Sequence, residues 1–231
     1  MKTYFKLLLL FALFFAIGQP RAVADTKTVC DGTQINNYNV PFSGDYFAGT
    51  DATNTSSQMI YTASQLGIAD GSKISAITFY TYSSTIHSFI STATVEIRLL
   101  NTTSSTITSA TDMSTNRSNA TLVFSGNIPS GATYTTIQFT GDPFVYDGNN
   151  LLIDTKVTEK GNDNRSVQWT GESATSGASC YTYGKNSTFK TQAFLPKMMI
   201  TYTSSSTVAL SGTPSFPSAV TEGNSVTDNT N

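Results

Sequence analysis

Residues 141–157 constrain the fold more than any other part of the chain. Asp147-Gly148 supplies the positive-φ positions that a tight turn needs, and Pro143 stops a strand from running into that turn. The chain then reads as a core strand, because its side chains alternate between two faces. One face carries Leu151, Ile153 and Val157, and the other carries Leu152, Asp154 and Lys156.

Short alternating segments of this kind recur along the chain, separated by polar turns and without intervening helices. This pattern predicts an all-β fold, an antiparallel two-sheet β-sandwich of jelly-roll-like type. An immunoglobulin domain would be shorter. The strands are expected at 58–61, 73–82, 92–100, 122–124, 137–139, 151–157, 167–169 and 196–202.

One short helical turn is expected after the first of these strands. Thr62 followed three residues later by Gln65 matches a capping box, and Gly67 matches the residue that ends a helix. The segment 101–120 has almost no apolar residues and is expected to be a loop. A Gly-, Ser- and Ala-rich loop is expected to lead to Cys180.

The N-terminus predicts a secretory signal peptide. Lys2 and Lys6 precede an apolar run, and Ala22-Val23-Ala24 matches the small-residue pattern of a cleavage site. The apolar run, Leu7 to Ile17, is too short to span a membrane, which needs about 20 residues. We therefore expect a secreted, surface-associated protein. Its regions are a signal peptide (1–24), a β-sandwich domain (25–203) and a Ser/Thr/Pro/Gly-rich linker or lead-in to a further module (204–231).

The net charge of the mature chain limits the classes of partner that it can bind. Loss of Lys2, Lys6 and Arg21 with the signal peptide leaves 10 basic residues against 15 acidic ones, a formal charge of −5. With no basic patch, binding to nucleic acid or to an anionic membrane has no electrostatic support. We expect a monomer that does not insert into membranes.

The sequence contains two cysteines, Cys30 and Cys180. An exported chain meets an oxidising compartment, so a disulfide between them is expected, with two unpaired thiols as the alternative. Such a bridge would close a loop of about 150 residues and stabilise the fold by up to about 5 kcal/mol.

Five segments of the chain form a recognisable combination, namely 57–67, 73–80, 122–126, 143–151 and 195–198. Together they resemble a β-sandwich accessory module of secreted and cell-surface multidomain proteins of Bacteroidetes-type bacteria, often found beside fibronectin type III-like repeats. The resemblance covers roughly residues 34–202 and implies an extracellular, non-catalytic module that is adhesive or glycan-binding. It brings no catalytic residues with it.

The residues themselves also argue against catalysis. The one histidine, His87, lies between two expected strands, and no G-x-S-x-G nucleophile motif is present. Glu96 is the only glutamate on a clear strand, and Arg98 on the same face suggests a surface ion pair, so a glycan-cleaving carboxylate pair is disfavoured. No enzymatic function is expected.

No cofactor is expected, although a structural calcium ion remains an alternative. Oxygen-bearing side chains crowd the central region, and calcium prefers such ligands. Asp and Asn are also common turn residues, and no D-x-D-x-D-G loop occurs. The residues concerned are Asp142, Asp147, Asn149, Asn150, Asp154, Asn162, Asp163 and Asn164.

Tyrosines are the candidate binding residues. Tyr80 and Tyr82 lie on the strand face opposite Ile77 and Phe79, and Tyr181 and Tyr183 lie in the Gly-rich loop. Exposed rings stack on the C–H faces of sugars, so these four residues predict an extracellular glycan as partner. A surface protein as partner and a structural spacer role are the alternatives. Trp169 shares a face with Val167 and is expected in the core.

Overall fold

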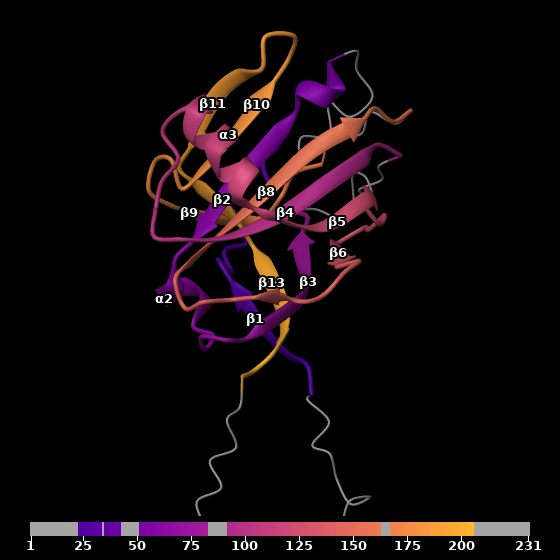
Figure 1. Cartoon of the computed structure of the whole chain (residues 1–231). Helices are drawn as coiled ribbons and strands as arrows, with labels where there is room; N and C mark the ends of the chain where they lie inside the picture. Colours follow the sequence, from indigo (N-terminus) through magenta and orange to yellow (C-terminus); the bar gives the residue numbers. More distant parts are fainter. Residues whose placement is uncertain (1–22, 34, 43–50, 83–91, 163–166, 206–231) are drawn as a thin grey trace, which may run out of the picture.

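The computed structural model describes residues 23–33, 35–42, 51–82, 92–162 and 167–205. These residues form an all-β molecule with little helix, as predicted (Figure 1). The strands are β1 (Asp25–Val29), β2 (Ser56–Tyr61), β3 (Lys73–Tyr80), β4 (Thr94–Thr102), β5 (Thr121–Asn127), β6 (Tyr134–Gln138), β7 (Phe144–Val145), β8 (Asn150–Glu159), β9 (Gly171–Ser173), β10 (Ser179–Tyr183), β11 (Thr188–Gln192), β12 (Phe194–Pro196) and β13 (Met198–Thr203). The helices are η2 (Ala52–Asn54), α2 (Ala63–Leu66) and α3 (Ala110–Asn119).

Two antiparallel sheets make up the sandwich. One has five strands, in the order β1-β13-β3-β6 with β7 also pairing with β3, and the other has six, in the order β11-β10-β2-β8-β4-β5. A small third sheet pairs β12 with β9. The chain passes repeatedly from one large sheet to the other, as from β2 to β3 and from β7 to β8. The predicted two-sheet architecture is therefore confirmed.

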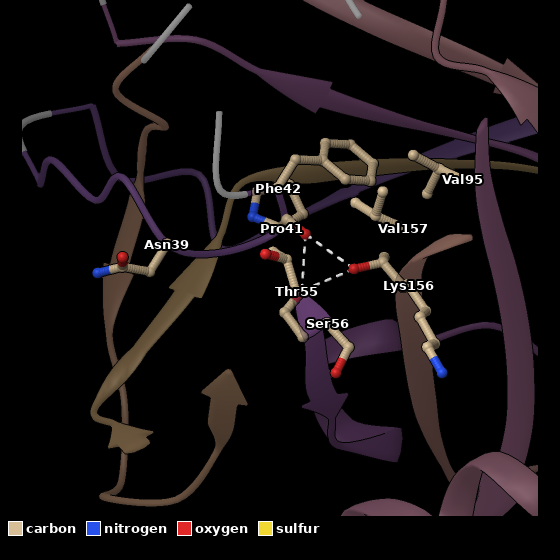
Figure 2. Close-up of a pocket in the computed structure, with 10 residues that line it drawn as sticks. Asn39, Pro41, Phe42, Thr55, Ser56, Val95, Lys156 and Val157 are labelled. Carbon is tan, nitrogen blue, oxygen red and sulfur yellow. Dashed lines mark hydrogen bonds between the residues drawn. The ribbon is translucent and has the colours of Figure 1, made fainter. Parts of the chain in front are cut away.

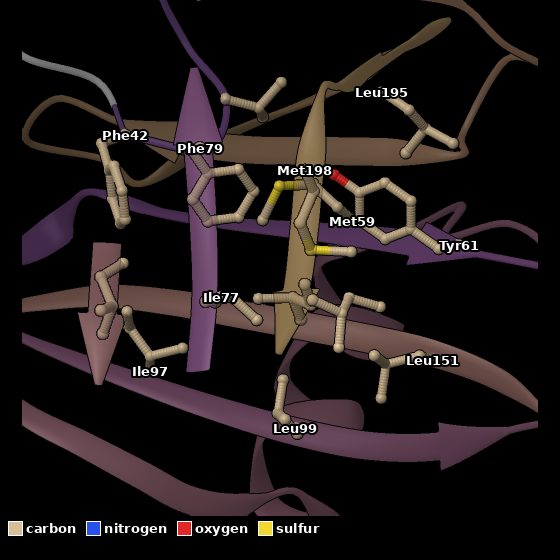
Figure 3. Close-up of a cluster of buried hydrophobic side chains, with 14 of the residues drawn as sticks. Phe42, Met59, Tyr61, Ile77, Phe79, Ile97, Leu99, Leu151, Leu195 and Met198 are labelled. Atoms are coloured by element: carbon tan, nitrogen blue, oxygen red, sulfur yellow. The ribbon is translucent and has the colours of Figure 1, made fainter. Parts of the chain in front are cut away.

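The main hydrophobic core lies between the two large sheets (Figure 3). The alternation seen in the sequence sets its composition, since Leu151, Ile153 and Val157 of β8 point into it as predicted. Trp169 is fully buried there, and its indole Nε1 donates a hydrogen bond to the Phe42 carbonyl at 3.1 Å. The placement of Trp169 in the core is thus confirmed.

Helix α2 forms as the sequence predicts. The Thr62 side chain accepts a hydrogen bond from the Gln65 amide, and the Gln65 side chain accepts one from the Thr62 amide. Gly67 ends the helix in the left-handed conformation, with φ of 57°.

The expectation of a loop over residues 101–120 is wrong, because this segment contains α3. Ser109 caps α3 by accepting a hydrogen bond from the Asp112 amide, and Asp112 adds negative charge to the first turn. Met113 is the one buried residue of the helix. Apolar periodicity therefore could not identify α3 in the sequence. Hydrogen bonds and ion pairs to the six-stranded sheet hold it instead.

Candidate functional site

Aromatic rings gather on the outer side of the five-stranded sheet, near the end of β3. Ile77 and Phe79 of β3 face the core, so Tyr80 faces outward and pairs across the ladder with Tyr134 of β6. Their ring centroids lie 6.1 Å apart at an interplanar angle of 50°. Tyr134 is 54% exposed and Tyr82, two residues beyond Tyr80, is 41% exposed. We call Tyr80, Tyr82 and Tyr134 the tyrosine face.

Neighbouring side chains fix the orientation of Tyr80. Its hydroxyl donates a hydrogen bond to Met199 Sδ at 3.7 Å, and Lys197 Nζ lies 4.8 Å from the ring centroid, as a cation–π contact requires. Lys197 also forms an ion pair with Asp31. The surface thus combines two strand-borne rings, those of Tyr80 and Tyr134, with a cation and a carboxylate from the segments that follow β12 and β1.

Tyr181 and Tyr183 lie elsewhere and do not join the tyrosine face. They belong to β10 of the six-stranded sheet, so their predicted position in a loop is wrong. Their rings stack at 5.6 Å with an interplanar angle of 26°, and Tyr181 packs against the main core. Both side chains are half-buried. The four predicted tyrosines therefore form two separate pairs on different sheets.

The predicted disulfide between Cys30 and Cys180 is wrong, because both residues are free, buried thiols. Cys30 belongs to the core between the sheets, where Gln65 Nε2 donates a hydrogen bond to its sulfur at 3.6 Å. Cys180 belongs to a second cluster, with Ile60 and Leu152, on the opposite face of the six-stranded sheet. That sheet lies between the two sulfurs. Burial raises the pKa of each thiol to about 12.

Among the oxygen-bearing residues of the central region, Asp147 has an ordinary turn role and Asn150 bonds to a distant segment of the chain. Asp147 accepts a hydrogen bond from the Asn149 amide at 3.0 Å, and Asn150 accepts one from the Ala63 amide at 2.9 Å. Among the described residues, no three His, Cys, Asp or Glu side chains form a group that would hold a metal ion. His87, Asp163 and Asn164 lie outside the described residues.

A buried ionic network on the outer face of the six-stranded sheet was missed in the sequence. Asp154 is fully buried, accepts a hydrogen bond from Gln58 Nε2 at 2.9 Å and forms an ion pair with Arg117 of α3. Arg117 also pairs with Glu96 at 2.7 Å, and the predicted Glu96–Arg98 pair is present at 3.1 Å. Burial raises the pKa of the Asp154 carboxyl, and Arg117 and Gln58 oppose that rise. The network joins α3 to β2, β4 and β8.

A small cavity lies between the start of β2 and β8 (Figure 2). Its volume is about 10 Å³, close to the minimum for one water molecule. Ser57 donates a hydrogen bond to the Pro41 carbonyl at 2.6 Å, and the Thr155 hydroxyl lies 2.8 Å from that of Ser57. Thr55, whose buried hydroxyl has no hydrogen-bond partner in the described part of the chain, also lines it. The cavity is too small for an organic ligand.

No protein-family model matches the chain, and no curated protein matches it. Distantly similar solved structures include two of Cwp84. The cysteine protease and lectin-like domains of Cwp84, a surface layer associated protein of Clostridium difficile, are 11% identical over 66% of this chain and 33% of that chain, with a TM-score of 0.40. Clostridial cysteine protease Cwp84 after propeptide cleavage is 10% identical over 81% of this chain and 42% of that chain, with a TM-score of 0.45. This chain spans less than half the length of either, and the likeness carries no argument about its function.

Proposed function

We propose that this chain is a secreted, non-catalytic surface module that binds an extracellular glycan on the tyrosine face. The observation that carries the proposal is the exposure of Tyr134 and Tyr82, at 54% and 41%, beside a Tyr80 ring already held in place. Sugar rings present flat C–H surfaces that stack on such aromatics, and their hydroxyls need nearby polar partners such as Lys197 and Asp31.

Rigidity favours weak sugar stacking at this position. Tyr80 and Tyr134 stand on neighbouring strands that pair over five residues, so binding costs little ordering of the protein. The resemblance to accessory modules of Bacteroidetes-type surface proteins supports an extracellular role of this kind. Protein adhesion on the same rings and a structural spacer role are the alternatives.

A glycan array probed with the mature chain tests this proposal. Tyr134→Ala should weaken binding about five-fold, since one stacked ring contributes about 1 kcal/mol. Tyr134→Phe keeps the ring and should bind as the wild type does. Leu122→Ala removes an exposed apolar side chain from the other large sheet and is the matched control.

Three outcomes contradict the glycan proposal or its site. Absence of binding to any glycan would favour protein adhesion or the spacer role. Binding that survives Tyr134→Ala and Tyr82→Ala together would refute the tyrosine face. Binding that is lost instead in Tyr181→Ala/Tyr183→Ala would move the site to β10.

A further inference from the structure

A larger hollow lies on the outer face of the six-stranded sheet, remote from the tyrosine face. It lies between α3 and the β10–β11 hairpin. Its floor is formed by β2 and β8, which are neighbouring strands of this sheet (Figure 1). Its volume is about 250 Å³. The residues important for its chemistry are Ala110 and Ser114 of α3, Ser56 of β2, Thr182 of β10, and Asp154 and Lys156 of β8.

The charges at the floor of this hollow do not balance. Asp154 is neutralised by Arg117, and Glu96 bonds both Arg98 and Arg117. Lys156 lies opposite Glu96 in the β4–β8 ladder, yet its side-chain ammonium forms no ion pair or hydrogen bond with any residue that the structure describes. Three charged residues line the hollow. Arg117 and Asp154 pair with each other, so the half-buried Lys156 is the one left without an ionic partner among the described residues.

The walls offer groups that suit a hydroxylated molecule. The Thr182 hydroxyl donates a hydrogen bond to the Asn54 carbonyl at 2.8 Å, so the Ser56 hydroxyl, 2.7 Å from that of Thr182, donates to it. Both hydroxyls retain a lone pair with which to accept a hydrogen bond from a further donor. Ala110 and Met113 add an apolar patch on the α3 side. Ser187 also lines the hollow, and its φ of 48° belongs to the tight turn that joins β10 to β11.

We propose that this hollow binds a single hexuronic acid ring, with the ligand carboxylate paired to Lys156 and the ring hydroxyls bonded to Ser56 and Thr182. A carboxylate would balance the unpaired lysine, and charge-assisted hydrogen bonds are stronger than neutral ones. The volume is just below the range of about 300–1,000 Å³ for pockets that take drug-sized ligands, so one sugar ring fills it. This site goes beyond the glycan proposal for the tyrosine face and does not depend on it.

Titration of the mature chain with D-glucuronate, followed by protein-observed NMR or calorimetry, tests the proposal. D-glucose lacks the carboxylate and acetate lacks the ring, so each should bind about tenfold more weakly or not at all. Lys156→Met should lower glucuronate affinity about tenfold, while Lys160→Met, an exposed lysine beyond the end of the same strand, should not change it. Oligogalacturonate in place of the monosaccharide distinguishes the end of an acidic polymer from a free sugar acid.

A steric variant tests the location without changing charge. Ser114→Phe should block the hollow and abolish glucuronate binding, whereas Ser118→Phe, one turn further along α3 and outside the hollow, should leave it intact. Tyr134→Ala should also leave it intact, which separates this site from the tyrosine face. The proposal is overturned if glucuronate does not saturate, if glucose binds equally well, or if binding survives Lys156→Met.

Discussion

The two cysteines are buried in different surroundings, and each surrounding keeps its thiol protonated. Cys30 lies in the main core, and Cys180 lies in the smaller cluster beneath α3. A pKa of about 12, in place of 9.0, makes the thiolate fraction at neutral pH about a thousandfold smaller than that of a free thiol. Because the thiolate is the reactive form, both residues should be inert in the folded protein.

Thiol labelling tests this directly. Maleimide or iodoacetamide should label neither cysteine of the folded protein within minutes at pH 7.5. Denaturation without reductant should then release two reactive thiols per chain, counted by intact mass. A denatured chain with no labelled cysteine would show that Cys30 and Cys180 are oxidised after all.

The same burial predicts that alkali destabilises the fold. Between pH 9 and about pH 12 the unfolded chain releases the Cys180 proton while the folded chain retains it, so stability falls as pH rises. The fall approaches about 1.4 kcal/mol for each pH unit and each thiol. Urea unfolding at pH 8.5, 9.5 and 10.5 should show a shallower decline for Cys180→Ala than for the wild type. Equal slopes would contradict the prediction.

At the scale of elements, α3 differs from the rest of the fold because polar contacts hold it. Asn116 Nδ2 donates a hydrogen bond to Gln58 Oε1 at 3.1 Å, and Gln58 Nε2 donates to the Met113 carbonyl at 2.8 Å. Arg117 adds the ion pairs with Asp154 and Glu96. The helix in turn covers Asp154, which explains how a carboxylate on the outer face of a sheet comes to be fully buried.

Removal of the Arg117 side chain should therefore destabilise the fold strongly. Arg117→Met leaves Asp154 buried without its cation and should lower the free energy of unfolding by about 3 kcal/mol. Adding Asp154→Asn should recover part of that loss, as should lowering the pH, because either change removes the buried charge. Urea unfolding of the single and double variants gives the interaction free energy between Arg117 and Asp154.

Arg98→Met is the matched control for this cycle. Arg98 pairs with Glu96, which is more exposed and keeps its contact with Arg117, so this change should cost less than about 1 kcal/mol. Equal losses in Arg98→Met and Arg117→Met would contradict the role given to Asp154.

The difference between strands held by apolar packing and a helix held by polar contacts explains which elements could be predicted from the sequence. In β4, Val95, Ile97 and Leu99 alternate with polar residues, so the sequence alone identifies the face of the strand that packs into the core. In β11, which is mostly polar and lies at an edge of its sheet, no such signal exists. Helix α3 depends on partners far away in the chain, and local pattern cannot contain that information.

The candidate surface was predictable to the same extent. Tyr80 and Tyr82 follow from the alternation of β3, but Tyr134 enters only through the pairing of β3 with β6. Asp154 lies on the face of β8 opposite the core residues Leu151 and Ile153, and so looks like a solvent-facing residue until α3 is placed over it. Tyr134 and the burial of Asp154 were missed because both depend on which strands and helices become neighbours.

For the molecule as a whole, the arrangement of β1 and β13 ties both ends of the domain together. Asp25 pairs with Tyr202 and Val29 pairs with Met198, so the domain begins and ends at one end of the sandwich (Figure 1). The Asp25 carboxylate also accepts a hydrogen bond from the Ser204 hydroxyl at 3.0 Å. Residues 25 and 204 therefore lie close together at this end of the domain. None of the helices in the described part of the chain is long and apolar enough to cross a membrane.

Signal-peptide cleavage after Ala24 would make the first residue of β1 the first residue of the mature protein. Cleavage five residues later would remove β1, uncover the edge of β13 and take away the buried Val29. We therefore expect the intact mass of the exported protein to correspond to a chain that begins at Asp25. Replacing Ala22 and Ala24 with bulky residues should block processing, because the cleavage site requires small side chains. An exported chain that still carries residues 7–17 would contradict both the signal peptide and the secreted role proposed for the tyrosine face.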